Sequence, residues 1–414
     1  MYENLVFQDV TKLLIHDIKS NSLPRAILFS GDEASGKLTA ALETARILSC
    51  SNVGKKAFNC ECTSCLQSKA LTSTNLMLLG PRDCFLEIQA AKQSFLNAFK
   101  ENASYLNATR YLFLRSIRKL TLRFNPILWQ GNNNLSKIAS LLDQINEKLE
   151  ILDFPRSLPD FNNPDEVKQL EKLCDDLVKD SSTLENSYLY NSIPVNQIRN
   201  LEFWCRIKSE DGKKTIIIEN ADRMLDSVRN ALLKILEEPP ADCIFILLTS
   251  KRNAIMETIL SRVRTYNFKN RLLSEQQSVI QRVFHNDYFN GSINDYLLTF
   301  LPVPPTKIKE FAVEFFKCVA NRNIIEAGSF NSELNKFEPK KILSIFLAEL
   351  INCQKKLLNS QIGTEVSAKC VNIIRNCWIN VNLYNLSTVA ALEILYKDLS
   401  VLNSQNEGIF RICL

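Results

Sequence analysis

The sequence predicts an α/β domain built on a parallel sheet, followed by helices that continue to the end of the chain. Residues 26–30 and 214–219 are too continuously apolar for half-exposed strands and are typical of strands buried in a parallel sheet. A helical pattern follows each run, and a third apolar run, residues 243–248, begins shortly after Pro239 and Pro240. Such an alternation of strands and helices is the pattern of an α/β sheet.

The other elements of this first region follow in order. Residues 10–18 and about 37–48 are expected to form helices on either side of the first strand. After the second strand, a helix carries Leu225, Val228 and Leu232 on one face and is stopped by the two prolines. A further short helix is expected over residues 254–260.

Two stretches lack strand signals and read as helical. Between about residues 84 and 190 we predict a helical insertion, because apolar residues recur every 3.6 positions in 135–152 and 167–177, on either side of a proline-bearing break. After about Asn270 the chain is expected to be helical throughout. Its clearest amphipathic segments are residues 308–321, 341–357 and 389–402.

The composition excludes several classes of protein. Only 10 of the 414 residues are glycine, well below the roughly 7% of average proteins, so collagen-like, glycine-linker and many-hairpin all-β chains are excluded. No GxG is present, which excludes a GxGxxG dinucleotide loop. The formal net charge of +5 neither requires nor excludes nucleic acid.

The beginning of the chain and the hydropathy pattern predict a cytoplasmic protein with no membrane partner. The N-terminus has no basic region followed by a long apolar stretch, and no window approaches the ~18 apolar residues of a membrane helix. Thirteen cysteines in a reducing compartment are not expected to form disulfides.

A glycine loop after the first strand resembles a phosphate-binding loop. Gly31 and Gly36 are followed by Lys37, in the order GxxxxGK. The glycines allow backbone N–H groups to wrap a phosphate, and the lysine would reach its oxygens. Leu38 stands where Ser or Thr would bind Mg²⁺, so ATP binding is expected to be weak or absent. A loop kept only for its shape remains an alternative.

The end of the second strand carries Glu219 and Asn220. P-loop ATPases place a metal-binding acid at this strand end, often followed by a Glu that activates water. Glu219 could ligate a metal, but Asn220 cannot accept a proton as a base. The alternative is that both are ordinary polar residues that end a strand.

Arg262 follows the short helix expected over 254–260. An arginine at this position could act on the nucleotide of a neighbouring subunit. Capping a helix or pairing with a carboxylate is the alternative role.

Four cysteines, Cys50, Cys60, Cys62 and Cys65, fall within sixteen residues. In a chain with only two histidines they fit a structural zinc site with four thiolate ligands, although a single residue between Cys60 and Cys62 is tighter than usual. Free thiols are the alternative.

A basic helix face lies in the insertion, made by Arg115, Arg118, Lys119 and Arg123 with aromatic residues among them. Such a face can grip a phosphate backbone. More often it is a solvated face over a packed apolar one. The two histidines stand alone, so no histidine-based catalytic cluster is expected.

Taken in order, these motifs resemble the delta-prime type of clamp-loader subunit of bacterial DNA polymerase III. The resemblance rests on residues 23–37, the four cysteines, 193–199, 219–224, Ser261 with Arg262, and above all on the ALLKILEEPP stretch at 231–240. It implies an AAA+ domain over residues 1–269 that includes the zinc module at 50–65 and the insertion. A helical lid over 270–312 and a helical collar over 313–414 would follow.

The resemblance also implies a function. Subunits of this type do not hydrolyse ATP; they join a pentameric ring with gamma/tau and delta subunits that places the sliding clamp on primed DNA. Arg262 would be the arginine lent to the ATP site of a neighbouring subunit. The family's Ser-Arg-Cys has Val263 in place of cysteine here, and its zinc pattern has one residue more between the second and third cysteines.

Two other functions remain open. A catalytic clamp-loader ATPase of the gamma/tau type shares the cysteines and the arginine, but should have an intact GK[ST] and an Asp-Glu strand end. An interaction scaffold that acts through the insertion at 84–190 is the other, and it is compatible with the first function.

Overall fold

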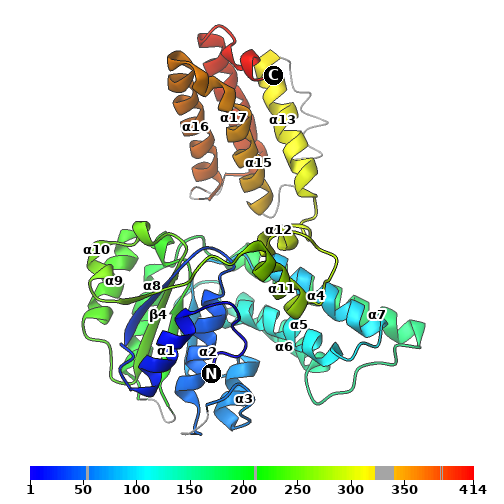
Figure 1. The fold of residues 1–414 in the computed structure, drawn as a ribbon, viewed down its shortest axis with the longest axis vertical. Coiled ribbons are helices and arrows are strands. Elements are labelled where there is room, and N and C mark those ends of the chain that lie inside the picture. Colours follow the sequence, from blue (N-terminus) through cyan, green and yellow to red (C-terminus); the bar gives the residue numbers. More distant parts are fainter. Residues whose placement is uncertain (53–55, 209–211, 322–339, 383, 385) are drawn as a thin grey trace. The chain divides into compact units, whose positions relative to one another are not determined.

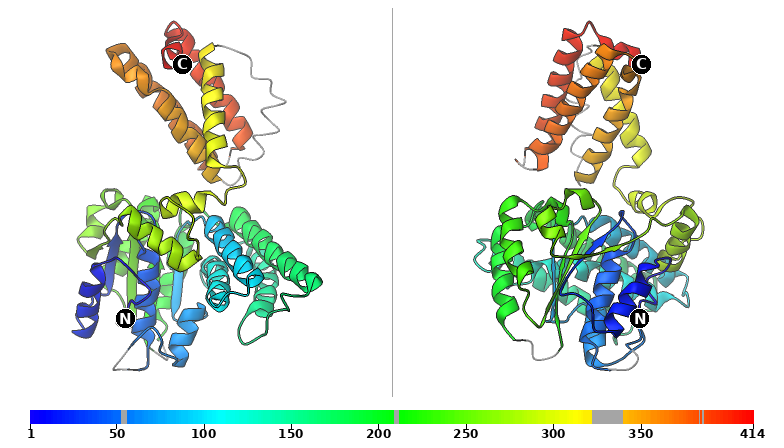
Figure 2. Two further views of the ribbon diagram at one scale, coloured as in Figure 1. Left: turned by 45° about the vertical axis from the view of Figure 1, so that its right-hand side comes forward. Right: turned by 60° about the vertical axis from the view of Figure 1, so that its left-hand side comes forward.

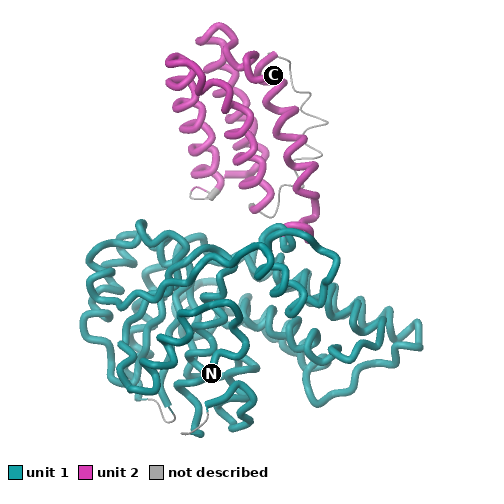
Figure 3. The backbone as a smooth tube through the Cα atoms, in the orientation of Figure 1, with its two compact units in different colours: residues 1–297 teal, residues 298–414 magenta. Residues whose placement is uncertain are grey.

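The computed structural model describes residues 1–52, 56–208, 212–321, 340–382, 384 and 386–414. Residues 53–55 of the predicted zinc module and 322–339 of the predicted collar lie outside these ranges. The chain divides into two compact units, residues 1–297 and 298–414 (Figure 3). Each unit is described by itself below. The finer boundaries at residues 269 and 312 remain predictions.

Unit 1 is built on a five-stranded parallel sheet, which confirms the predicted fold class. The strands are β1 (Ala26–Ser30), β2 (Leu76–Leu79), β3 (Lys214–Ile218), β4 (Cys243–Thr249) and β5 (Arg264–Asn267). Their order across the sheet is β2-β3-β4-β1-β5, and all four neighbouring pairs are parallel. Because the carboxyl ends of parallel strands share one edge, Ser30, Ile218 and Thr249 bring their following loops together.

The apolar runs are continuous because both faces of the sheet are buried. Ile216 and Ile218 belong to one hydrophobic cluster, whereas Ile217 belongs to another on the opposite face. The second cluster is covered by helices α1 (Val10–Lys19) and α2 (Lys37–Ser49). Helices on both faces are visible in Figure 2.

The other helices of unit 1 include those of the insertion, which is confirmed as helical. Figure 1 shows α4 to α7 gathered on one flank of the unit. Their apolar side chains share the hydrophobic cluster of the first sheet face. The remaining helical elements of the unit are α3 (Thr63–Ala70), α4 (Phe85–Lys100), α5 (Leu106–Thr121), η1 (Leu122–Phe124), α6 (Leu135–Leu152), α7 (Pro164–Tyr188), α8 (Val195–Arg206), η2 (Ala221–Arg223), α9 (Asp226–Glu237), η3 (Arg252–Ala254), α10 (Glu257–Leu260) and α11 (Leu273–Phe284).

The structure differs from the predicted elements at three places. Strands β2 and β5 had no sequence signal: β2 has only four residues, and β5 is a polar edge strand whose one buried residue is Tyr266. The helix expected over 254–260 is divided into η3 and α10, because Ile255 and Met256 have extended backbones. The segment expected over 341–357 leaves the α-helix after Cys353.

Unit 2 is a bundle of helices. Helix α12 (Ile293–Leu298) ends at its boundary, and the unit contains α13 (Pro305–Asn321), α15 (Lys340–Cys353), η4 (Lys355–Asn359), α16 (Gln361–Asn382), α17 (Thr388–Gln405) and η5 (Ile409–Cys413). Phe315, Phe346 and Phe410 are fully buried in it. The buried Asn403 donates to the carbonyls of Val319 and Ala320, which joins α17 to α13. Within the described ranges, no helix has both the length and the apolar content needed to cross a bilayer.

Candidate functional site

The predicted phosphate loop joins β1 to α2, as a P-loop does. Gly36 has φ of +94°, a left-handed conformation that favours glycine, and it lies directly before α2. A Cβ on Gly31 would lie 2.6 Å from the carbonyl oxygen of Phe268. Both glycines are therefore required by the shape of the loop.

Lys37 is held by the loop itself. Its Nζ donates to the carbonyl oxygens of Gly31 and Asp32, each at 2.5 Å. Burial lowers the pKa of Lys37 to about 8. Leu38, where a P-loop carries a hydroxyl, is buried in the hydrophobic cluster that packs α2 on the sheet. Leu38 therefore packs in the hydrophobic core of unit 1.

Residues far away in the sequence brace the same loop. Arg271 donates to the carbonyl of Ala34 at 2.6 Å and to that of Val6 at 3.1 Å. The side-chain amide of Gln8 donates to the carbonyl of Ser35 at 3.1 Å. The loop carbonyls of Ala34 and Ser35 are therefore held by side chains from two other parts of the chain.

Glu219, directly after β3, is paired on both of its carboxylate oxygens. Oε1 accepts from Arg82 at 2.8 Å, and Oε2 accepts from Arg123. Burial opposes the ionisation of Glu219, but the charges of Arg82 and Arg123 outweigh it and lower the pKa of its carboxyl. The sequence gives no sign of these two partners.

Asn220 has a left-handed backbone, with φ of +50°. Its side-chain amide donates to the carbonyl of Pro81. Two residues further on, Asp222 accepts a hydrogen bond from Thr249 Oγ1 at 2.7 Å, which links the ends of β3 and β4. Asn220 therefore makes a contact that stabilises the fold, and its amide cannot act as a general base.

The cations of the basic helix face in the insertion are buried or partly buried, and each has a partner within the protein. Arg123 is fully buried against Glu219, and Lys119 pairs with Glu87 of α4. Arg118 pairs with Asp153, and Arg115 donates to the carbonyl of Lys69. These cations therefore pair with groups of the protein, over a buried apolar face that includes Phe113 and Ile117.

The four predicted metal ligands come together. Their sulfur atoms all lie within 4.8 Å of one another, with Cys50 at 3.8 Å from Cys60 and 4.0 Å from Cys62. Four thiolates around zinc, with Zn–S bonds of ≈ 2.3 Å, have sulfur atoms about 3.8 Å apart. The cluster thus has the donor set and the spacing of a closed tetrahedral metal site.

A charged pair from α2 supports this cluster. Arg46 donates to Sγ of Cys65 at 3.0 Å and pairs with Glu43 at 2.6 Å, and both side chains are buried. The guanidinium thus donates a hydrogen bond to one of the four sulfur atoms, while its charge is balanced by Glu43. Arg46 has no sequence signal, because it lies inside an ordinary helix.

Arg262 lies on the surface, separated from the end of α10 by Ser261. Its guanidinium donates to the carbonyl of Thr258 at 2.7 Å and pairs with Glu237, the last residue of α9, at 2.6 Å. These contacts are those of the alternative role, in which Arg262 caps a helix or pairs with a carboxylate. An exposed ion pair of this kind contributes only about 0 to 1 kcal/mol, so it does not hold the arginine firmly.

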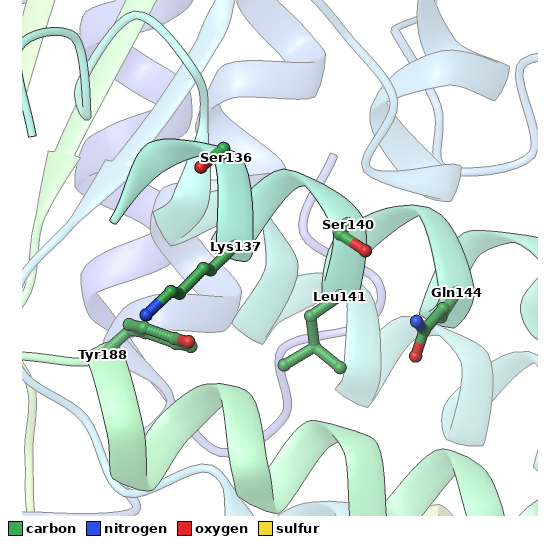
Figure 4. Close-up of a pocket in the computed structure, with 6 residues that line it drawn as sticks. All are labelled: Ser136, Lys137, Ser140, Leu141, Gln144 and Tyr188. Atoms are coloured by element: carbon green, nitrogen blue, oxygen red, sulfur yellow. The ribbon is translucent and has the colours of Figure 1, made fainter. Parts of the chain in front are cut away.

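An open groove between α6 and α7 has a volume of about 440 Å³. In Figure 4 the Lys137 side chain extends toward the ring of Tyr188. The residues that line the groove are Ser136, Lys137, Ser140, Leu141, Gln144 and Tyr188. None of them is a predicted site residue.

The parallel sheet, the glycine loop before α2 and the acid after β3 define an α/β protein of the P-loop class. Within this class, the family described as "DNA polymerase III, delta subunit" has a family model that matches residues 7–127 and 157–271. These ranges are more than half of the chain, and the chain belongs to this family of clamp-loader subunits.

Relatives show the same relationship over shorter stretches. Over 79 residues the chain is 39% identical to DNA polymerase III subunit delta' of Bacillus subtilis, covering 19% of this chain and 24% of that protein. Over 56 residues it is 46% identical to subunit tau of the same organism, covering 14% and 10%. The matches thus span a quarter or less of these curated relatives.

Among solved structures, the chain is similar to a DNA polymerase III gamma subunit-related protein of Thermotoga maritima. The identity is 18% and the TM-score 0.27, over 51% of this chain and 79% of that one. A TM-score this low adds nothing to the description of the fold.

Proposed function

We propose that this chain is a clamp-loader subunit of the delta-prime type that does not hydrolyse ATP. The observation that carries the proposal is the pairing of Glu219 with two guanidinium groups, which takes up both oxygens that a metal would need. Leu38 and Asn220 remove two further parts of ATPase chemistry, a metal-binding hydroxyl and a general base. The residues at positions 38, 219 and 220 therefore each favour a subunit that does not hydrolyse ATP.

In this proposal the chain contributes to catalysis through Arg262. The subunit joins a pentameric ring with gamma/tau and delta subunits, and the ring places the sliding clamp on primed DNA. An arginine supplied to a neighbour stabilises the charge that develops on the transferred phosphoryl group. The weak pair with Glu237 can be exchanged for that contact at little cost.

We also propose that the cysteine cluster holds a structural zinc ion. Cys50, Cys60, Cys62 and Cys65 would fill all four positions, so the metal would stabilise the fold and leave no position open for substrate. The site joins the end of α2 to α3.

A catalytic gamma/tau-type subunit is the second candidate, favoured by the identity with subunit tau over 56 residues. ATP turnover by the isolated, full-length chain separates the two. We expect no turnover above the buffer rate, with or without primed DNA. Robust hydrolysis that is lost on Lys37→Ala would reject the proposed function and support the second candidate.

A further inference from the structure

A row of alternating charges lies at the carboxyl end of β3, where a P-loop protein would bind its metal. Lys119 and Arg82 both pair with Glu87, and Arg82 and Arg123 both pair with Glu219. The contact from Arg82 to Glu87 is 2.5 Å and that to Glu219 is 2.8 Å. Every oxygen of the two carboxylates therefore has a cationic partner.

The insertion supplies most of this network. Glu87 lies on α4, Lys119 on α5 and Arg123 on η1, whereas Arg82 comes from the loop between β2 and α4. Only Glu219 follows a strand of the sheet. The insertion, to which the sequence assigns no function, thus contributes side chains to the surroundings of Glu219.

Arg123 is the most firmly held member. Its side chain is 0% exposed, and a second nitrogen, Nη1, donates to the carbonyl of Lys119 at 2.8 Å. Its own carbonyl accepts a hydrogen bond from Trp129 Nε1, also at 2.8 Å. Its departure would leave a buried carboxylate with one guanidinium fewer, which is strongly unfavourable.

A divalent cation does not fit this arrangement. Mg²⁺ requires free oxygen ligands in near-octahedral geometry, and both oxygens of Glu219 are already bound to guanidinium groups. Three cations and two anions give the network a positive charge, which repels a metal ion. Leu38, which has no hydroxyl, offers no compensating ligand.

We infer that Arg82 and Arg123 occupy the place of the divalent cation at Glu219, and that the helical insertion makes this site unable to bind metal. The two guanidinium groups provide the positive charge that the buried carboxylate needs and fix the end of β3 without a nucleotide. The inference deepens the proposed function, because it gives the reason why this subunit would lack metal-dependent hydrolysis.

The test measures Mn²⁺ binding to the intact chain by electron paramagnetic resonance, with Mn²⁺ alone as the probe. Mn²⁺ prefers oxygen ligands, so the cysteine cluster does not compete for it. Wild type and Glu219→Gln are expected to bind the same amount. The double variant Arg82→Met/Arg123→Met is expected to gain one Mn²⁺ site, which disappears when Glu219→Gln is added.

Two results would overturn the inference. One is Mn²⁺ binding by the wild type that Glu219→Gln removes, and the other is a folded arginine double variant that gains no site. If the double variant does not fold, the melting temperature of Glu219→Gln is measured instead. This change leaves the buried Arg123 without its carboxylate, while the partly exposed Arg82 keeps Glu87. It should lower the melting temperature by about 10 °C, whereas a loss no larger than that of the control would overturn the inference.

The matched control is Glu202→Gln, which breaks the exposed pair between Glu202 and Arg206. It should change the melting temperature by less than about 2 °C. None of these measurements involves partner subunits or Arg262. Failure of the inference is therefore distinguishable from failure of the proposed function, which is tested by ATP turnover and by the ring.

Discussion

At the scale of single residues, Gly36 illustrates how the phosphate loop is constrained. Its φ is +94°, and a Cβ would lie 2.6 Å from Cδ1 of Leu5. Gly36→Ala is expected to lower the free energy of unfolding by about 2 to 3 kcal/mol, about 1 from the left-handed backbone and the rest from displacement of Leu5. Urea unfolding measures this loss.

Gly131 provides the control for that prediction. Its φ is +80°, but no neighbouring atom lies within 4 Å of the position of a Cβ. Gly131→Ala should therefore show only the backbone part, about 1 kcal/mol. Equal losses in the two variants would contradict the steric role assigned to Leu5.

The pH dependence of stability is a second prediction at this scale. Burial opposes the ionisation of Glu87, but Lys119 and Arg82 outweigh it and lower the pKa of Glu87 to about 2. A carboxyl whose pKa is lower in the folded state stabilises the protein fully above its unfolded value near 4.5. This contribution, about 3 kcal/mol at neutral pH, is lost as the pH falls from 4.5 to 2.

Glu87→Gln isolates this contribution from that of the other carboxyl groups. The difference in free energy of unfolding between wild type and variant should be largest at pH 6 and shrink steadily below pH 4.5. Denaturant titrations at several pH values measure it. A difference that stays constant from pH 6 to pH 3 would show that the charge of Glu87 is not what stabilises the network.

At the scale of elements, helix α2 connects the phosphate loop to the cysteine cluster. It begins at Lys37 and ends next to Cys50. We expect the purified chain to contain one zinc ion, and expect a strong chelator to lower its melting temperature because metal binding contributes to folding. Cys62→Ser should lose the metal, whereas Cys318→Ser, outside the cluster, should retain it; elemental analysis distinguishes them.

The pair of Arg46 and Glu43 gives another prediction for this element. Removing both charges together, in Glu43→Gln/Arg46→Met, avoids leaving one buried ion alone. Because Arg46 donates to Cys65 Sγ, the zinc affinity should fall by about 10- to 100-fold. Competition with a chromophoric chelator measures the affinity. An affinity equal to that of wild type would mean that Arg46 only fills space beside the cluster.

At the scale of the whole molecule, the insertion is part of the core of unit 1. Phe95 and Phe113 from the insertion share a hydrophobic cluster with Met77 and Phe245 of the sheet. Deleting residues 84–190 would expose that face of the sheet, so the shortened chain should not fold cooperatively. Circular dichroism during thermal unfolding tests this; a sharp transition at the wild-type temperature would show that the insertion is dispensable for the fold.

The extent to which the sequence predicts the structure depends on how local each signal is. Strands β1, β3 and β4 are recognisable because both of their faces are buried, and the cysteine cluster because its members are close in sequence. β5 has a single buried residue and gives no such signal. Arg82 and Arg123 lie 137 and 96 residues from Glu219, so only the tertiary fold brings them together.

The proposed action of Arg262 on a neighbour's nucleotide is tested most directly by one measurement. It is the DNA-stimulated ATPase rate of a ring reconstituted from this chain with gamma/tau and delta subunits. Arg262→Ala should reduce turnover at the neighbouring site by about 10³- to 10⁵-fold without preventing assembly, whereas Arg252→Ala, an exposed arginine of η3, should have no effect. An assembled ring that retains its full rate with Arg262→Ala would contradict the proposed role of Arg262.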